Sequence, residues 1–316
     1  MTRVVFMGTP DFAVPSLEAL CDAGFDVVGV FTQPDRPAGR GKKLTACPVK
    51  QCALRRGLDV YQFEKIRQPE GVAQLKALAP EVMVTAAFGQ ILTQEILDIP
   101  AHGTLNVHAS LLPKHRGSAP INWCILEGEA KTGVTIMRTD AGIDTGDIVA
   151  AREAAIGESE TAGALTERLS KLGAALLAET LPGYLAGDIV PVRQDAALAS
   201  YEPMLNKAMG AIDWKRDARA IANQVRGLDP WPGAYTDMDG GRFRICLARA
   251  VDSDADAAPG TVIVSGPKAG LVVRCGSGAL EILEMQAPNA KRMAAKAYLM
   301  GKKIDEGAVF GKDERA

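Results

Sequence analysis

Residues 2–32 read TRVVFMGTPDFAVPSLEALCDAGFDVVGVFT, and this stretch decides the fold class. Residues 2–7 are a continuous apolar run, which predicts a buried strand, and residues 25–32 repeat that pattern. Between them, apolar residues recur at helical spacing up to Gly24, a residue type that commonly ends helices. A strand, a helix and a second strand at this spacing predict a βαβ unit and a parallel sheet.

The turn after the first strand argues against a dinucleotide cofactor. It reads Gly8-Thr9-Pro10-Asp11 and lacks the GxGxxG pattern. Without those glycines the backbone cannot approach a pyrophosphate closely. We therefore expect a Rossmann-like sheet that does not bind NAD.

The remaining pattern predicts two domains in an α/β protein. Strands and helices alternate up to a long amphipathic helix, and an irregular stretch follows. Five short β-like segments with glycine and proline between them then predict a small OB-like β-barrel. We expect a Rossmann-like, mostly parallel sheet domain at residues 1–188, a linker at 189–205 and the OB-like domain at 206–316. The β-like segments are residues 234–237, 242–250, 260–265, 270–275 and 279–285.

Composition excludes several classes of protein. No apolar run approaches the roughly 20 residues that a membrane helix needs. The 6 cysteines have no CxxC spacing, which disfavours a metal site and a disulfide framework. The amino terminus leads directly into a strand without room for a signal peptide, so we expect a cytoplasmic protein with no membrane segment.

Charge differs between the two parts of the chain, whose formal net charge is −2. Residues 1–206 contain 19 Lys and Arg against 24 Asp and Glu, whereas residues 207–316 contain 17 against 14. The mildly basic second part permits an anionic partner without requiring one.

A polar pair marks the end of the strand predicted at residues 103–108. Asn106 and His108 are two residues apart, so their side chains project from the same face of the sheet. At the carboxyl end of a parallel strand, that face borders the place where α/β proteins bind ligands. Asn106 is a neutral donor suited to a developing oxyanion, and His108 can move a proton near neutral pH.

A second polar cluster, GIDTGD at residues 142–147, lies between two predicted strands. Its Asp144 is either an ordinary turn former or a carboxylate that contacts His108 and raises the basicity of the imidazole. Amide, imidazole and carboxylate together suit attack of an amine on an activated carbonyl carbon. Neither Ser110 nor Ser118 lies in a GxSxG elbow, and the histidines lack metal-binding spacing, so we expect no metal.

Residues 33–48, QPDRPAGRGKKLTACP, are rich in proline, glycine and positive charge. We expect no regular structure here, and the segment is long for a connection between a strand and a helix. It is either a solvated loop or a basic finger for phosphate or nucleic acid. Its basic side chains are Arg36, Arg40, Lys42 and Lys43.

Two segments resemble the signature of the 10-formyltetrahydrofolate-dependent formyltransferases: NVHASLLPKHRGSAPI (106–121) and GVTIMRTDAGIDTGDI (133–148). The similarity extends in the same order to MGTPDFAVPSLEAL, VFTQPDRPAGRGKKLTACPVK and DPWPGAYT, and thus covers nearly the whole chain. It is strongest to the branch that acts on methionyl-tRNA. The chain departs from the family pattern at His115, where an aromatic residue is usual.

The resemblance implies formyl transfer from 10-formyltetrahydrofolate to the α-amino group of methionyl initiator tRNA, which prepares the tRNA for translation initiation. It places the catalytic trio on Asn106, His108 and Asp144, with His108 either shuttling a proton or stabilising the oxyanion. It places the tRNA-contacting finger on residues 36–43 and implies a monomer without a metal. The folate loop falls on Ser110, Leu111, Leu112 and Pro113, and we expect Phe88, Gly89, Ile91 and Leu92 to wall the same site.

The predicted second domain offers further candidates for tRNA contact. Trp214 and Trp231 are expected to pack in the core, with base stacking as the alternative. Six basic residues are either a tRNA platform or ordinary solvated side chains: Lys207, Arg216, Arg219, Arg226, Arg242 and Arg244.

Other functions remain open at the level of sequence. A formyltransferase acting on a nucleotide-linked amino sugar would share the trio, but a small substrate does not need the basic finger. A folate-dependent hydrolase would release formate without an amine acceptor. An RNA-binding protein with a decayed active site is disfavoured by the intact Asn106, His108 and Asp144.

Overall fold

The computed structural model describes residues 1–38 and 43–311. The chain groups into two compact units, each described here by itself. The predicted division into residues 1–188, 189–205 and 206–316 stays a prediction beside this grouping. No helix among the described residues combines the length and apolar character needed to cross a membrane. The first unit contains Met1–Pro120, Lys131–Ala155 and Thr166–Glu202, and the second contains Ile121–Ala130, Ile156–Leu165 and Pro203–Ala316.

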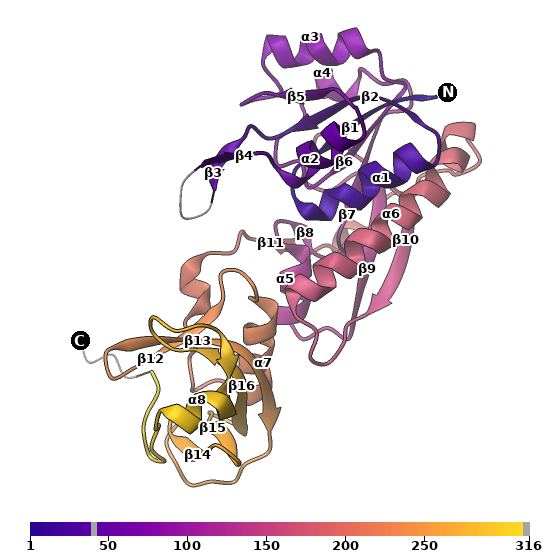
Figure 1. The fold of residues 1–316 in the computed structure, drawn as a ribbon. Helices are drawn as coiled ribbons and strands as arrows, with labels where there is room; N and C mark the ends of the chain where they lie inside the picture. The colour runs from indigo at the N-terminus through magenta and orange to yellow at the C-terminus, as the bar shows by residue number, and fades with distance from the viewer. Residues whose placement is uncertain (39–42, 312–316) are drawn as a thin grey trace. The chain divides into compact units, whose positions relative to one another are not determined.

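A seven-stranded sheet in the order β10-β9-β7-β6-β1-β2-β5 forms the centre of the first unit (Figure 1). The five strands from β7 to β5 run parallel, and β9 and β10 pair antiparallel at the other edge. The predicted mostly parallel sheet is therefore confirmed. The strands are β1 (Arg3–Gly8), β2 (Asp26–Thr32), β5 (Val60–Gln62), β6 (Val82–Ala86), β7 (Thr104–His108), β9 (Lys131–Arg138) and β10 (Ile148–Ala155).

Helices cover both faces of this sheet, as the crossovers of a parallel sheet require. Val5 and Met7 pack in one buried cluster with residues of α3 and α4. On the opposite face, a Cβ at Gly173 of α6 would lie 2.7 Å from Val107 Cγ1, so this helix packs closely on β7. The helices are η1 (Asp11–Ala13), α1 (Val14–Asp22), α2 (Pro48–Arg55), α3 (Pro69–Leu78), α4 (Gln94–Leu97), η2 (Ala196–Leu198) and α6 (Ala162–Ala186), of which the part from Thr166 lies in this unit.

The strand order reverses between β1 and β6, and this places a ligand-binding edge in the sheet. From β1 the chain moves outward through β2 to β5, and then returns to the other side of β1 as β6. Ligands of open α/β sheets bind beyond the carboxyl ends of the strands at such a reversal. Here those ends are Gly8 and Ala86, and a Cβ at Gly8 would lie 2.9 Å from the Ala86 carbonyl oxygen.

The segment at residues 33–48 contains regular structure, so the expectation of none was wrong. β3 (Arg36–Ala38) and β4 (Lys43–Thr45) pair antiparallel on either side of residues 39–42. Pro37 pairs in register with Leu44. A two-stranded ribbon tolerates proline because each strand has a free edge to which the missing N–H can point.

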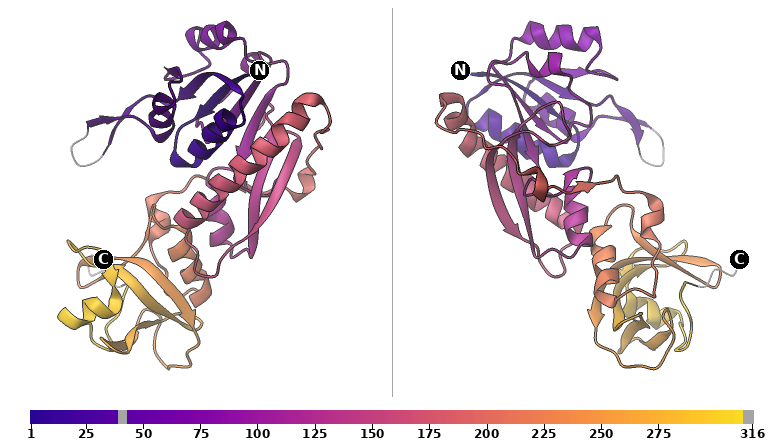
Figure 2. Two further views of the ribbon diagram at one scale, coloured as in Figure 1. Left: turned by 45° about the vertical axis from the view of Figure 1, so that its right-hand side comes forward. Right: turned by 180° about the vertical axis from the view of Figure 1, so that it is seen from behind.

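The second unit is built on an antiparallel sheet in the order β12-β13-β16-β15-β14, with β17 added to β16 (Figure 2). All five predicted β-like segments are present. Its strands are β12 (Ala234–Met238), β13 (Gly241–Val251), β14 (Val262–Gly266), β15 (Gly270–Arg274), β16 (Ala279–Gln286) and β17 (Met293–Ala294). Its helices are η3 (Lys207–Gly210), α7 (Ala218–Gly227), α8 (Ala295–Gly301) and α5 (Pro120–Leu126), which belongs here from Ile121.

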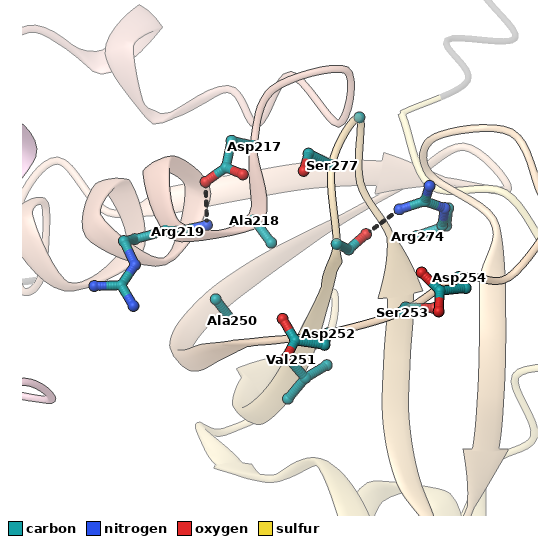
Figure 3. A pocket seen from close by; sticks show the side chains of 12 residues that line it. Asp217, Ala218, Arg219, Ala250, Val251, Asp252, Ser253, Asp254, Arg274 and Ser277 are labelled. Atoms are coloured by element: carbon teal, nitrogen blue, oxygen red, sulfur yellow. Dashed lines mark hydrogen bonds between the residues drawn. The ribbon is translucent and has the colours of Figure 1, made fainter.

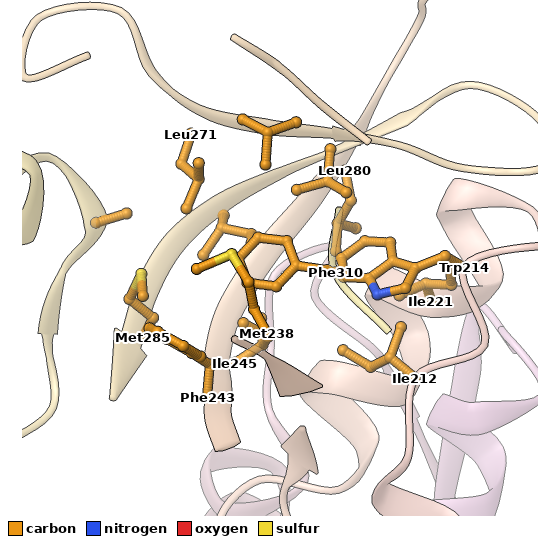
Figure 4. Close-up of a cluster of buried hydrophobic side chains, with 14 of the residues drawn as sticks. Ile212, Trp214, Ile221, Met238, Phe243, Ile245, Leu271, Leu280, Met285 and Phe310 are labelled. Carbon is orange, nitrogen blue, oxygen red and sulfur yellow. The ribbon is translucent and has the colours of Figure 1, made fainter. Parts of the chain in front are cut away.

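Aromatic side chains fill the core of the second unit (Figure 4). The rings of Trp214 and Phe310 stack with centroids 5.9 Å apart, and Phe243 meets Phe310 edge-on at 5.9 Å. Trp214 is only 4% exposed, and its indole N–H donates to Thr236 Oγ1 at 2.9 Å. The core role expected of Trp214 is confirmed. The same expectation for Trp231 was wrong, because this side chain is 53% exposed.

Candidate active site

Asn106 lies near the carboxyl end of β7, with its amide oriented by the neighbouring strand. Thr85 on β6 is in register with Asn106, and the Thr85 hydroxyl donates to Asn106 Oδ1 at 2.9 Å. Because the hydroxyl occupies the amide oxygen, the Asn106 NH2 group is the part left to donate to a ligand. Thr85 was not anticipated from the sequence, because only the register between β6 and β7 places it beside Asn106.

His108 ends the same strand and is 6% exposed. Its Nε2 lies 3.1 Å from the His115 carbonyl oxygen. Since a carbonyl oxygen only accepts hydrogen bonds, Nε2 carries the hydrogen and Nδ1 holds the lone pair of the neutral ring. Burial lowers the pKa of His108, whereas the carboxylate of Asp144 acts in the opposite direction. The imidazole is therefore neutral at pH 7.

Asp144 comes from the loop between β9 and β10 and faces the basic nitrogen of His108. Its Oδ1 lies 3.7 Å from His108 Nδ1, and its Oδ2 accepts a hydrogen bond from the Gly117 N–H at 2.8 Å. The residue has φ of 52°, a left-handed conformation that costs free energy unless its surroundings hold it. The structure thus brings together the imidazole and the carboxylate that the sequence could only pair by hypothesis.

The segment after His108 is tied to β9 through one hydroxyl. Thr135 Oγ1 donates to the Ser110 carbonyl oxygen at 2.7 Å and accepts from the Leu112 N–H at 3.1 Å. The Ser110 hydroxyl donates to the Lys114 carbonyl oxygen at 2.6 Å, and Pro113 follows a cis peptide bond. These hydrogen bonds hold the backbone of the loop that follows His108.

The expected wall residues follow β6 and have different surroundings. Phe88 is buried in the core cluster on one face of the sheet, and Leu92 packs against that cluster. Gln33 Nε2 donates to the carbonyl oxygens of Phe88 and Gly89 at 3.2 and 3.0 Å, which fixes this loop to the end of β2. Ile91 is 72% exposed, so a large apolar side chain faces solvent at this edge.

Comparison with known proteins places the chain in a family. The formyl transferase family model matches residues 2–181, and the model of the formyl transferase C-terminal domain matches residues 204–303. The chain belongs to the formyl transferase family. A methionyl-tRNA formyltransferase from Citrifermentans bemidjiense is 48% identical over 312 residues, covering 99% of this chain and 97% of that protein.

Solved structures share the fold of this formyl transferase at low sequence identity. An N-formyltransferase from Helicobacter canadensis, in complex with folinic acid and dTDP-3-aminofucose, superposes with a TM-score of 0.68 at 20% identity. The match covers 93% of this chain and all of that one. HypX from Aquifex aeolicus with tetrahydrofolic acid gives a TM-score of 0.61 at 17% identity, covering 96% of this chain and 50% of that one.

The basic segment of this formyl transferase is described only at its two ends. Arg36 Nη2 pairs with Glu64 Oε2 at 2.7 Å, and both side chains are exposed. Lys43 begins β4. Arg40 and Lys42 lie outside the described residues.

The basic candidates of the second unit divide by exposure. Arg226 is buried, and its guanidinium donates to Asn223 and to the carbonyl oxygens of Gly157 and Glu160, so it is a structural residue. Arg242 lies over the Tyr235 ring at 4.0 Å, and Arg244 contacts Asp229 at 3.6 Å. Lys207, Arg216 and Arg219 are exposed, as the sequence expectation allowed.

A surface hollow of about 840 Å³ lies in the second unit, and no residue of the trio lines it (Figure 3). Two of its charged side chains, Asp217 and Arg274, serve the fold. Asp217 accepts from the backbone of Arg219 and caps α7, while Arg274 donates to the carbonyl oxygens of Ala255 and Gly278. We assign this hollow no part in the reaction.

Sequence reasoning missed the side chains that residues 194–202 contribute to the first unit. Gln194 contacts the Asp144 loop and Arg116, and Glu202 Oε1 lies 2.9 Å from His115 Nδ1. β11 (Tyr201–Glu202) pairs parallel with β8 (Arg116–Gly117). A pairing of two residues has no periodic pattern, which is why this stretch reads as an irregular linker.

Proposed function

We propose that this protein transfers the formyl group of 10-formyltetrahydrofolate to the α-amino group of methionine on the initiator tRNA. The observation that carries the proposal is the approach of the Asp144 carboxylate to His108 at the carboxyl end of β7, the strand that also carries Asn106, in a chain similar over its full length to methionyl-tRNA formyltransferases. We further propose that the protein acts as a monomer in the cytoplasm.

Asn106 is the proposed donor to the oxyanion. When the amine attacks the formyl carbon, the formyl oxygen gains negative charge, and a fixed N–H donor stabilises that charge. Thr85 holds the amide oxygen, so the NH2 group is directed away from that contact. Loss of one such donor typically costs about 10²–10³ in kcat.

His108 is the proposed route for the amine proton. Its Nε2–H is held by the His115 carbonyl, so Nδ1 is the nitrogen that can accept the proton. The imidazolium that results has the Asp144 carboxylate 3.7 Å from Nδ1, which favours the charged form at that moment. The proton then passes to the departing folate nitrogen, directly or through water.

The formyl donor is proposed to bind beside the loop formed by Ser110, Leu111, Leu112 and Pro113. Ile91 and Ile143, the latter next to Asp144, are exposed and are the proposed apolar surface for the donor. A flat heterocycle with polar edges suits such a site, because apolar walls bury its faces and rigid backbone groups pair with its edges. Phe88, Gly89 and Leu92 complete the proposed wall.

The tRNA is proposed to bind through charge and stacking. Arg36, Arg40, Lys42 and Lys43 supply positive charge for phosphates on the first unit. On the second unit the exposed Trp231 offers a stacking surface, and Arg244 donates to the neighbouring Pro230 carbonyl. Aromatic and guanidinium planes of this kind suit the unstacked end of an RNA.

The decisive experiment supplies one donor and three acceptors. Purified protein is incubated with 10-formyltetrahydrofolate and either charged initiator tRNA, elongator methionyl-tRNA or a nucleotide-linked amino sugar. We expect formylation of the initiator tRNA at the highest kcat/KM. Transfer to the sugar alone, or release of formate without an acceptor, would overturn the proposal.

A further inference from the structure

A buried glutamine joins the loop that carries Asp144 to Arg116 on β8. Gln194 is 7% exposed, and its Nε2 donates to the carbonyl oxygens of Asp144 and Gly146 at 2.9 and 2.6 Å. Its Oε1 accepts from Nε and Nη2 of Arg116 at 3.1 and 2.7 Å. Both hydrogens and the oxygen of one amide are thus committed to two different segments.

Arg116 is held as firmly as the glutamine. Its side chain is 3% exposed, its Nη1 donates to the Tyr201 hydroxyl at 2.8 Å, and its guanidinium lies 5.5 Å from the centre of the Tyr201 ring. The Arg116 backbone N–H donates to the Ser200 carbonyl oxygen at 2.9 Å. Gln194 and Arg116 are both buried and bonded to each other, so displacing either one would leave a buried polar group without its partner.

The hydrogen bonds of Gln194 and Gly117 hold Asp144 in place and so fix its distance from His108. Gly117, next to Arg116, donates its N–H to Asp144 Oδ2, and Gln194 holds the Asp144 carbonyl on the other side. Asp144 is thereby fixed by its backbone and by its carboxylate in a left-handed conformation that it would otherwise leave.

We propose that Gln194, acting with Arg116, is a positioning residue that holds the Asp144 carboxylate against His108. The proposal rests on the function proposed above, because it assigns Gln194 no contact with either substrate. The other groups that face His108 are the His115 carbonyl oxygen and the His115 imidazole, which is itself paired with Glu202.

The sharpest test is Gln194→Glu, which has nearly the same shape as the natural side chain. A carboxylate still accepts from Arg116, but its second oxygen would face the carbonyl oxygens of Asp144 and Gly146 and repel them. We expect the Asp144 loop to withdraw and kcat to fall about 10²-fold, as displacements near 1 Å can cause. KM for both substrates should stay unchanged.

A spectroscopic readout separates positioning from general loss of stability. The chain has only 3 histidines, so histidine labelled with ¹³C gives few NMR signals to assign. Because Asp144 raises the pKa of His108, its withdrawal should move the His108 titration midpoint to lower pH in Gln194→Glu. Gln194→Met loses the hydrogen bonds without repulsion, and we expect a smaller change in the same direction.

Gln224 provides a matched control in the second unit. It too is buried, with Nε2 donating to the Met209 and Ala211 carbonyl oxygens and Oε1 accepting from Arg216. Gln224→Glu should lower stability by a similar amount while leaving kcat and the His108 midpoint as in wild type. An unchanged midpoint in both Gln194 variants, or the same shift in Gln224→Glu, would overturn the positioning role. If wild type formylates no tRNA yet the Gln194 variants shift the midpoint, the positioning role stands and the proposed function fails.

Discussion

Asn106 is the residue whose chemical role is easiest to isolate. Asn106→Ala removes the side-chain amide and keeps the backbone of β7 intact. We therefore expect kcat to fall about 10²–10³-fold with little change in KM for the donor. Steady-state kinetics with saturating tRNA measure this. Asn122→Ala serves as the control, since Asn122 makes one hydrogen bond to the Gly227 carbonyl oxygen in the second unit. Comparable losses of kcat in both variants would contradict the oxyanion role.

The pH dependence follows from the surroundings of His108. Burial places its pKa below the ordinary 6.5, so we expect kcat/KM to fall on the acid side as pH drops through that lowered value. Asp144→Asn removes the charge that raises this pKa, and the acid limb should therefore move to still lower pH while the plateau decreases. A limb that moves to higher pH in Asp144→Asn would contradict the assignment.

The lowered pKa of His108 also makes folding stability fall as pH decreases. Between the lowered pKa of folded His108 and the ordinary value, the unfolded chain binds more protons than the folded one. The contribution of His108 to stability therefore falls as pH decreases through this window and is constant above it.

Residue types and spacing predicted the candidate site only in part. Asn106 and His108 could be paired from the sequence because alternation along one strand puts them on one face. Thr85 and Asp144 come from other strands and loops, so only strand order and register bring them close. Gln194 could not be predicted, because nothing in an irregular stretch specifies which loop its side chain meets.

At the scale of elements, β9 supports the proposed folate loop through a glycine. A Cβ at Gly133 would lie 2.5 Å from Leu111 Cδ2 and would also meet the Arg152 carbonyl oxygen. Gly133→Ala should displace the loop, with an overpacking cost of about 1–3 kcal/mol. We expect KM for the formyl donor to rise roughly tenfold, which corresponds to about 1.4 kcal/mol.

A control for this variant is Gly241→Ala in the second unit. A Cβ there would lie 2.9 Å from Pro288 Cγ, so this position is also crowded, though less than Gly133, and it is far from Leu111 in the chain. It should lower the melting temperature without changing KM for the donor. An unchanged donor KM in a folded Gly133→Ala protein would argue that the loop does not contact the folate.

The hairpin of β3 and β4 is the second element with a testable role. Arg40→Ala should raise KM for the tRNA and reduce the slope of its logarithm against log salt by about 1, as expected for one lost phosphate contact. Arg56→Ala is a suitable control because this arginine pairs with Asp22 on the surface. If both variants keep the wild-type slope, Arg40 makes no phosphate contact with the tRNA.

Elements were predicted best where the sequence pattern is long. The strands β1, β2 and β7 and the five β-like segments of the second unit were all recognisable. The hairpin of β3 and β4 was not recognisable. Its strands pair over only three residues each, and Pro37 and the neighbouring glycines are residue types typical of loops. The pairing of β8 with β11 is shorter still.

At the scale of the whole molecule, the exposed Trp231 is the contact that we propose between the second unit and the tRNA. Stacking on one base is worth about 1–3 kcal/mol, so Trp231→Ala should raise KM for the tRNA roughly 5- to 150-fold without changing kcat. Trp231→Phe should recover part of the loss because it keeps a ring. Met300→Ala, which removes another exposed apolar side chain of the same unit, should have no effect. A wild-type KM in Trp231→Ala would exclude stacking at this position.

The contacts of Gln194, Ser200, Tyr201 and Glu202 also determine where this chain can be divided. A catalytic fragment that ended at residue 188 would leave the Arg116 guanidinium, which is almost inaccessible to water in the intact chain, without Gln194 and Tyr201. Such a fragment would lose the hydrogen bonds that hold Arg116, as well as the second unit. Chimeras between members of this family therefore need their junction after residue 202, so that each catalytic unit keeps its own residues 194–202.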